Sequence, residues 1–154
     1  MRNFILIIVL LTSQPAFAGS WRYNPNAGFG IYQPEGWHLT QEGRSSRIRG
    51  PDNDFAQSEI FIGSDWQSEI KTLEHLKNYV LRKESSPPQV LLLSGLNGFK
   101  TGSDIQGKYF LLREPQNIIV VEFELRGSKE QMEEGMTSLS SIEIRRKGIE
   151  YPAP

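Results

Sequence analysis

The main pattern along this chain is an alternation of hydrophobic and polar residues, which is typical of β-strands that bury one face. Glu122 and Glu124 lie between hydrophobic positions, so the second face of their strand must be at least partly exposed to solvent. The segment 105–113 precedes this strand across a Glu-Pro-Gln turn, and the two segments together predict a β-hairpin. The hydrophobic positions of the second arm are Ile119, Val121, Phe123 and Leu125.

Shorter segments predict further strands. The run from Val90 to Leu93 is continuously apolar, which predicts a buried strand. Residues 19–26 are expected to precede the first strand, and a last short strand is expected at Ile142 and Ile144. The remaining predicted strands lie at residues 28–32, 37–39, 46–49 and 59–63.

Two segments change to a helical period. Thr72 is the expected N-cap of the first helix, because its hydroxyl can accept a hydrogen bond from a free amide of the first turn. The apolar face of this helix consists of Leu73, Leu76, Tyr79 and Val80. The second helix is predicted to begin after Ser128, which forms a capping-box sequence with Gln131. Its apolar face consists of Met132, Met136 and Leu139.

The order of these elements predicts an α+β domain, because strands, a helix, a run of strands, a helix and a strand follow one another. We expect a single-domain α/β/α sandwich whose mostly antiparallel sheet is covered by two main helices. No repeat, low-complexity tract or linker divides the chain. We expect residues 1–18 to be a cleavable signal peptide, residues 19–145 to be the domain and residues 146–154 to be a C-terminal tail.

The signal peptide is predicted from three features near the start of the chain. Arg2 is positively charged, an apolar run extends from Phe4 to Leu11, and small residues precede the expected cleavage after Ala18. The apolar run would span only about 12 Å as a helix, which is far shorter than a hydrocarbon core of roughly 30 Å. We therefore expect a periplasmic or extracellular protein with no stable membrane insertion after cleavage.

The segment from Phe29 to Trp37, an aromatic-rich strand that runs into a Pro-x-Gly-Trp turn, resembles the opening of PsbP-like and DcrB-like domains. The likeness continues through both helices and the hairpin to the segment 140–143. It implies an α/β/α sandwich that serves as an accessory or binding module. Such domains include extrinsic photosystem subunits, a bacterial envelope protein involved in phage uptake and a regulator of a small GTPase. They share no catalytic residues, so the resemblance assigns none here.

Composition excludes several classes of function. The chain has no cysteine, which excludes disulfides, thiol catalysis and cysteine metal sites. Its 17 basic and 18 acidic residues nearly balance. This balance argues against nucleic acid as a main partner, because phosphate binding needs clustered positive charge.

No arrangement of residues predicts catalysis, a cofactor or a metal. His38 and His75 are expected in a strand region and in a helix, with no carboxylate at ligand spacing. The serines lie in no Gly-x-Ser-x-Gly frame. The oxygen ligands of residues 52–54 lack the glycine and glutamate that complete an EF-hand loop. Glu122 and Glu124 are interpreted as the wet face of a sheet or as partners of Lys108, rather than as a catalytic acid pair.

Aromatic residues are the candidates for a partner surface, since they provide a large contact area at low entropic cost. Trp21 and Tyr23 lie in the N-terminal segment, and Trp66 lies in a loop before the first helix. The alternative for Trp66 is that it folds back over the start of that helix. Trp37 is expected to close one end of the core. A group of basic residues predicts either a small basic strip or the protection of an edge strand: Arg44, Arg47 and Arg49.

Together these features predict a non-catalytic accessory or protein-binding module of the cell envelope, with another envelope protein as its partner. The second hypothesis is a carrier of a small ligand or ion. The third is an unrecognised hydrolase, which nothing in the sequence specifically favours.

Overall fold

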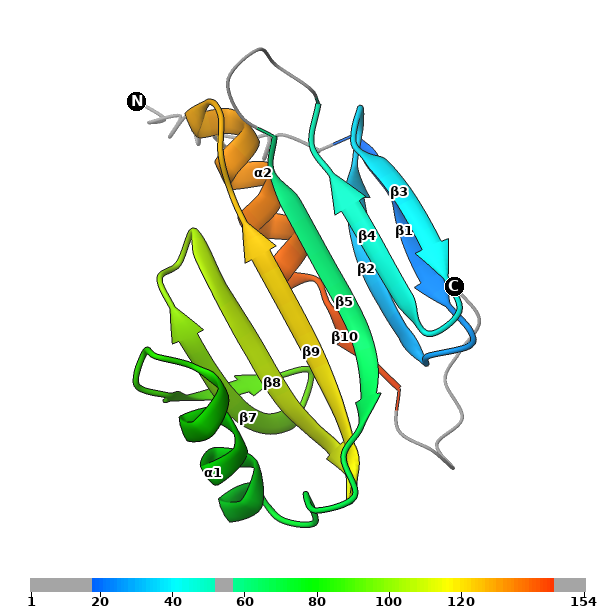
Figure 1. Ribbon diagram of the computed structural model, residues 1–154. Coiled ribbons are helices and arrows are strands. Elements are labelled where there is room, and N and C mark those ends of the chain that lie inside the picture. The colour runs from blue at the N-terminus through cyan, green and yellow to red at the C-terminus, as the bar shows by residue number, and fades with distance from the viewer. Residues whose placement is uncertain (1–17, 52–56, 146–154) are drawn as a thin grey trace, which may run out of the picture.

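The computed structural model describes residues 18–51 and 57–145 of the chain. The predicted signal peptide apart from Ala18, the segment 52–54 and the predicted tail lie outside the described residues. The described part forms ten strands and two helices (Figure 1). Neither helix of this part is long and apolar enough to cross a membrane.

The strands form two sheets, and all neighbouring strands pair antiparallel. The smaller sheet has the order β1-β2-β10, with β1 at Gly19–Asn24, β2 at Phe29–Pro34 and β10 at Glu143–Ile144. The larger sheet has the order β3-β4-β5-β9-β8-β7-β6. Its strands are β3 (His38–Glu42), β4 (Ser45–Arg49), β5 (Glu59–Trp66), β6 (Gln89–Leu93), β7 (Leu96–Gly102), β8 (Gln106–Glu114) and β9 (Asn117–Glu124).

Both helices begin where the sequence predicts. Helix α1 spans Leu73–Lys83, and the Thr72 side chain accepts a hydrogen bond from the backbone N–H of His75. Helix α2 spans Lys129–Ser140, and Ser128 forms the predicted capping box with Gln131. Because these caps satisfy backbone donors that the helix itself leaves unpaired, they fix the first turn of each helix.

Strand β9 lies near the middle of the larger sheet, and its side chains enter two cores on opposite faces. Ile119 and Val121 enter the main core, which β2 and α2 close from the other side. Ile118 enters the second core, which α1 covers together with Phe110 of β8. The two-residue period of the strand therefore divides its apolar side chains between the two faces.

The predicted α/β/α sandwich with two main covering helices is wrong. Helix α1 packs on β7 and β8 and covers only part of one face. The opposite face is covered by the smaller sheet as well as by α2. The helices have only 11 and 12 residues, and most of the ordered backbone is strand, so the architecture is more nearly all-β.

The physical reason for this error is the largely polar sequence of β1. Residues 19–24, expected to precede the first strand, form β1 and pair with β2. Trp21 and Tyr23 are the large hydrophobic residues of β1, and two positions are too few to predict a strand by alternation. Backbone pairing with β2 therefore adds a strand to a second sheet where the sequence predicts none.

The strand predicted at Val90 to Leu93 is confirmed as β6, but the prediction that it is buried is wrong. Strand β6 lies at the edge of the larger sheet, and Val90 and Leu92 are 80% and 67% exposed. Leu91 and Leu93 pack against the main core. A continuous apolar run does not show whether one or both faces of its strand are covered. In β6 only the face that carries Leu91 and Leu93 is covered.

Candidate binding site

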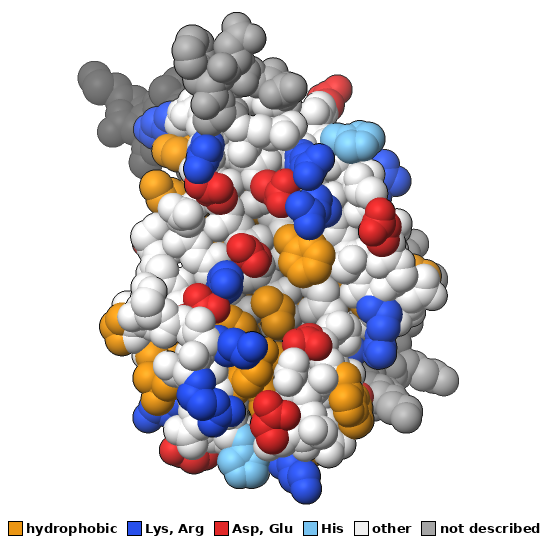
Figure 2. Space-filling view, in the orientation of Figure 1, with side chains coloured by type: hydrophobic (Ala, Val, Ile, Leu, Met, Phe, Trp, Pro, Cys, Tyr) orange, Lys and Arg blue, Asp and Glu red, His pale blue; other side chains and the backbone are white. Residues whose placement is uncertain are grey.

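One face of the larger sheet is only partly covered. Helix α1 covers β7 and β8, whereas β4 and β5 carry no helix on this face (Figures 1 and 2). The exposed part is hollowed into a cavity of about 740 Å³, which we call the sheet groove. It is lined by Arg47, Gln57, Glu59, Phe61, Glu84, Ser86, Thr101, Gly102, Gln106, Gly107, Lys108, Glu122, Phe123 and Glu124.

The floor of the sheet groove consists of two rows of side chains that cross neighbouring strands. Directly opposite residues of an antiparallel pair point to the same face, so each row follows from the strand register. The first row is Arg47, Phe61, Glu122, Lys108 and Thr101, from β4 to β7. The second row is Arg49, Glu59, Glu124 and Gln106, from β4 to β8.

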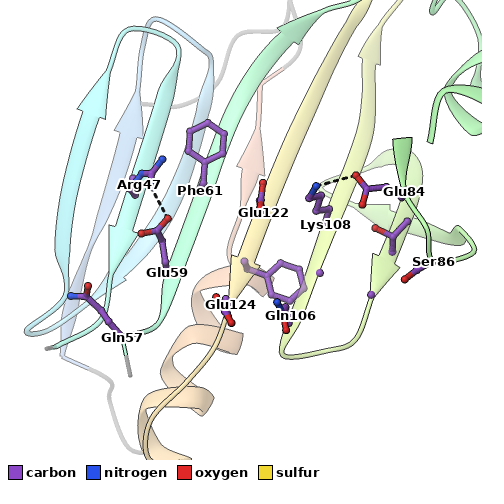
Figure 3. A pocket seen from close by; sticks show the side chains of 14 residues that line it. Arg47, Gln57, Glu59, Phe61, Glu84, Ser86, Gln106, Lys108, Glu122 and Glu124 are labelled. Atoms are coloured by element: carbon purple, nitrogen blue, oxygen red, sulfur yellow. Dashed lines mark hydrogen bonds and ion pairs between the residues drawn. The ribbon is translucent and has the colours of Figure 1, made fainter. Parts of the chain in front are cut away.

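Ion pairs form at both sides of the groove. Glu59 accepts hydrogen bonds from Arg47 at 2.7 Å and from Arg49 at 2.8 Å. On the other side, Lys108 donates to Glu84 at 3.0 Å, which ties β8 to the end of α1 (Figure 3). These pairs are partly exposed, so they orient the side chains more than they stabilise the fold.

Glu122 and Phe61 lie in the middle of the groove. Figure 3 shows Glu122 between the two groups of ion pairs. Its side chain is exposed, and within the described part of the chain it makes no hydrogen bond or ion pair of its own. The Arg47 guanidinium lies 5.4 Å from the centre of the Phe61 ring, which is a cation–π distance. The groove therefore offers a flat aromatic ring beside an unpaired carboxylate.

A second cavity continues the groove along the sheet. It has a volume of about 430 Å³ and shares Phe61 with the first cavity. Its other lining residues are Arg44, Ser45, Gly63, Ser64, Asp65 and Val120. The two cavities together form a long, open surface.

The surroundings of Lys108 favour its protonated form. The hydrogen bond to Glu84 raises the pKa of Lys108 above its ordinary value, the negative charge of Glu122 raises it further, and partial burial opposes both effects. Burial also raises the pKa values of Tyr79 and Tyr109 above their ordinary values. Lys108 is therefore an ammonium and both tyrosines are neutral in the physiological pH range.

These pKa directions predict a loss of stability at alkaline pH. All three groups hold their protons more tightly in the folded chain, so their stabilisation is fully present below their unfolded pKa values, about 10. It is lost as the pH rises through the folded pKa values. We expect the urea midpoint to fall above about pH 10, with a shallower fall for Tyr109→Phe. An equally steep fall in this variant would contradict the assignment of Tyr109.

The aromatic residues predicted as a partner surface do not lie together on one sheet. Trp66 ends β5 of the larger sheet and is 59% exposed, so it does not fold back over α1. Trp21 and Tyr23 lie on β1 of the smaller sheet and are half-buried. The Trp21 ring lies against Gly30, and the Arg145 guanidinium lies 4.0 Å from the centre of the Tyr23 ring.

The proposed edge-protecting role of Arg44, Arg47 and Arg49 is not what the structure shows: Arg44 lies in the turn between β3 and β4 and lines the second cavity, and the other two lie on β4. Strand β4 lies between β3 and β5, so it is not an edge strand, and both residues pair with Glu59. Lys108 lies directly opposite Glu122, as expected, but its ion pair is with Glu84.

Sequence reasoning missed Phe61 and Glu84 as site residues. Alternation within 59–63 places Glu59 and Phe61 on one face, which was the available signal. Glu59 and Phe61 become part of the sheet groove only because β5 pairs with β9, and this pairing brings distant parts of the chain together.

No metal site is found among the described residues. They contain no group of three histidine, aspartate or glutamate side chains that could hold a metal. His38 lies on β3, and the Nδ1 atom of His75 on α1 accepts from the backbone N–H of Lys71.

Comparison with known proteins gives a structural likeness only. No protein family matches the sequence, and no curated protein matches it significantly. The fold is similar to that of a protein from Bacteroides thetaiotaomicron VPI-5482 with a crystal structure at 1.50 Å resolution. The TM-score is 0.57 at 15% identity, over 87% of this chain and 51% of the other. This chain thus spans about half the length of the protein it resembles, and the likeness concerns the fold alone.

Proposed function

We propose that this chain is an exported, non-catalytic accessory protein of the cell envelope that binds another protein through the sheet groove. The export part of the proposal rests on the charged, apolar and small-residue pattern of residues 1–18. The accessory role is the one that the resemblance to PsbP-like and DcrB-like domains implies. The binding part rests on the open, charged floor of the groove.

The main support for the proposal is a mosaic of positively and negatively charged side chains across β4, β5, β9 and β8. Arg47, Glu122 and Lys108 alternate in sign along one row, with Phe61 between the first two. Small-ligand sites are usually enclosed and mostly apolar, whereas this surface is open and mostly polar (Figure 2). A protein surface of complementary charges fits such a mosaic, because charge complementarity gives specificity over a broad contact.

Reversing the charge at the centre of the groove tests the proposal. We expect Glu122→Lys to weaken the binding of a partner captured by cross-linking in the native envelope fraction by about tenfold, or roughly 1.4 kcal/mol. The reason is that a partner cation placed beside Glu122 would then meet a like charge. The measurement is titration of the purified partner with each variant.

A matched control separates the groove from general charge effects. Glu143 is exposed on β10 of the smaller sheet, and Glu143→Lys makes the same charge change away from the groove. Equal binding by both variants would show that the groove is not the interface. Repeated failure to enrich any partner would contradict the accessory role itself. A thermal-shift panel of metals and metabolites tests the carrier hypothesis, since a ligand of the folded state raises the melting temperature.

A further inference from the structure

Strand β6 is an unprotected edge of the larger sheet. It pairs with β7 alone among the described strands, and its sequence Gln-Val-Leu-Leu-Leu carries no charge. The opposite edge strand, β3, carries His38 and Glu42 and lies beside the arginines of β4. Sheet edges are normally protected from pairing by charges, proline or bulges, and β6 itself has none of these.

The exposed hydrophobic side chains of β6 lie on one face. Val90 lies opposite Phe99, which belongs to the core under α1, so Val90 and Leu92 point to the α1 side of the sheet. They are the two most exposed large hydrophobic residues of the described part. Leu81 of α1 is also 52% exposed, and its helix covers the same face.

The backbone of the same two residues also has no hydrogen-bond partner among residues 18–51 and 57–145. The β6–β7 hairpin has a two-residue turn, in which both Ser94 and Gly95 have positive φ. In such a hairpin the closing pair, Leu93 and Leu96, exchanges both backbone hydrogen bonds, and hydrogen-bonded pairs then alternate along the strands. The N–H and C=O groups of Val90 and Leu92 therefore point away from β7, toward the open edge.

We propose that two copies of this chain pair their β6 strands antiparallel about a two-fold axis at Leu91. In this register Val90 of one copy lies opposite Leu92 of the second, and each pair exchanges both backbone hydrogen bonds. All the outward-pointing groups of these two residues are then satisfied. The register also places Val90 and Leu92 of the two copies side by side on one face, so the strand is complementary to itself in both backbone and side chains.

The size of this contact sets its strength. Pairing of five-residue strands buries less surface than the roughly 1,200–2,000 Å² of a standard stable interface, so the dimer is a weak one, with a Kd on the order of tens of micromolar. It is independent of the sheet groove, because none of the residues that line the groove belongs to β6. A failure to detect the dimer would therefore not contradict the proposed function, and a failure of the proposed function would not contradict the dimer.

Sedimentation of the mature chain tests the proposal. We expect a reversible monomer–dimer equilibrium between about 1 and 500 μM. Val90→Lys should raise the Kd at least tenfold, since the two lysines replace the apolar contacts between Val90 of each copy and Leu92 of the other. Thr40→Lys places the same charge on the exposed edge strand β3 and should leave the Kd unchanged. A monomer at every concentration, or equal effects of the two variants, would overturn the proposal.

Disulfide trapping tests the register, because the chain contains no other cysteine. Leu91→Cys brings two thiols directly opposite each other in a non-hydrogen-bonded pair, with a Cα separation of about 4.5 Å that permits a disulfide. Val90→Cys places each thiol opposite Leu92 of the second copy and should form a covalent dimer far more slowly. Equal rates for the two variants would exclude the proposed register. If sedimentation also showed only a monomer, dimerisation through β6 would be excluded, and this edge would be open to pairing with a strand of a different protein.

Discussion

Replacing Trp37 with alanine is expected to lower the free energy of unfolding by about 3–5 kcal/mol, the range for large aromatic residues removed from a core. Trp37 is only 3% exposed and belongs to the main core. Its ring lies close to Gly135 of α2 and to Gly50 after β4, and its indole N–H donates to Glu134 at 2.8 Å. The substitution would leave a cavity between helix and sheet and deprive Glu134 of its donor.

Trp66 provides a matched control, since it is the same residue type in an exposed position. At 59% exposure it has less than half of its surface to lose, and Trp66→Ala should lower the free energy of unfolding by less than Trp37→Ala does, by about 2 kcal/mol at most. Urea unfolding of both variants, followed by far-UV circular dichroism, measures the difference. A loss below about 1 kcal/mol for Trp37→Ala would mean that Trp37 does not close the main core.

Gly98→Ala is expected to destabilise the protein by about 1–3 kcal/mol or more, because the added methyl group has no room. Gly98 lies on β7 opposite Leu111. A Cβ atom at this position would lie 2.0 Å from the carbonyl oxygen of Phe110 and 2.9 Å from the Cα atom of Leu111. Both are backbone atoms, so β7 and β8 must separate to admit the methyl group.

Gly50→Ala, directly after β4, is the corresponding control on the other side of the larger sheet. The nearest atom to a Cβ at Gly50 is the Cβ of Ser58, at 3.4 Å, which is an ordinary contact. We expect a change of less than about 1 kcal/mol, since alanine also restricts the unfolded chain. The comparison uses the urea midpoint and the slope of each variant. Similar losses at both positions would indicate that the β7–β8 spacing does not set the effect.

The helices of this fold were predictable from sequence, whereas the second sheet was not. Thr72 and Ser128 identify helix starts because capping is a local interaction between residues that are three apart. Strands β2 and β10 of that sheet were predicted, but β1 carries few hydrophobic residues, and its pairing with β2 leaves no local signal. The fold class was therefore wrong although most of the individual elements were placed correctly.

The candidate site was predictable only as isolated residues. Alternation showed that Glu122 and Glu124 lie on a wet face, and the structure places both in the sheet groove. It did not show which strands lie beside β9, because the order of strands depends on contacts between distant parts of the chain. The rows that cross β4, β5, β9 and β8 are a consequence of that order.

The pairing of β5 with β9 has a consequence for how fast this domain folds. It joins Ile60 to Phe123, which are 123 − 60 = 63 positions apart. The hairpins β6–β7 and β8–β9 need only short loops to close, whereas the ladder between them and the amino-terminal strands requires a long one. Domains dominated by such distant pairings fold in milliseconds to seconds, so the hairpins form early and the completed sheet appears last.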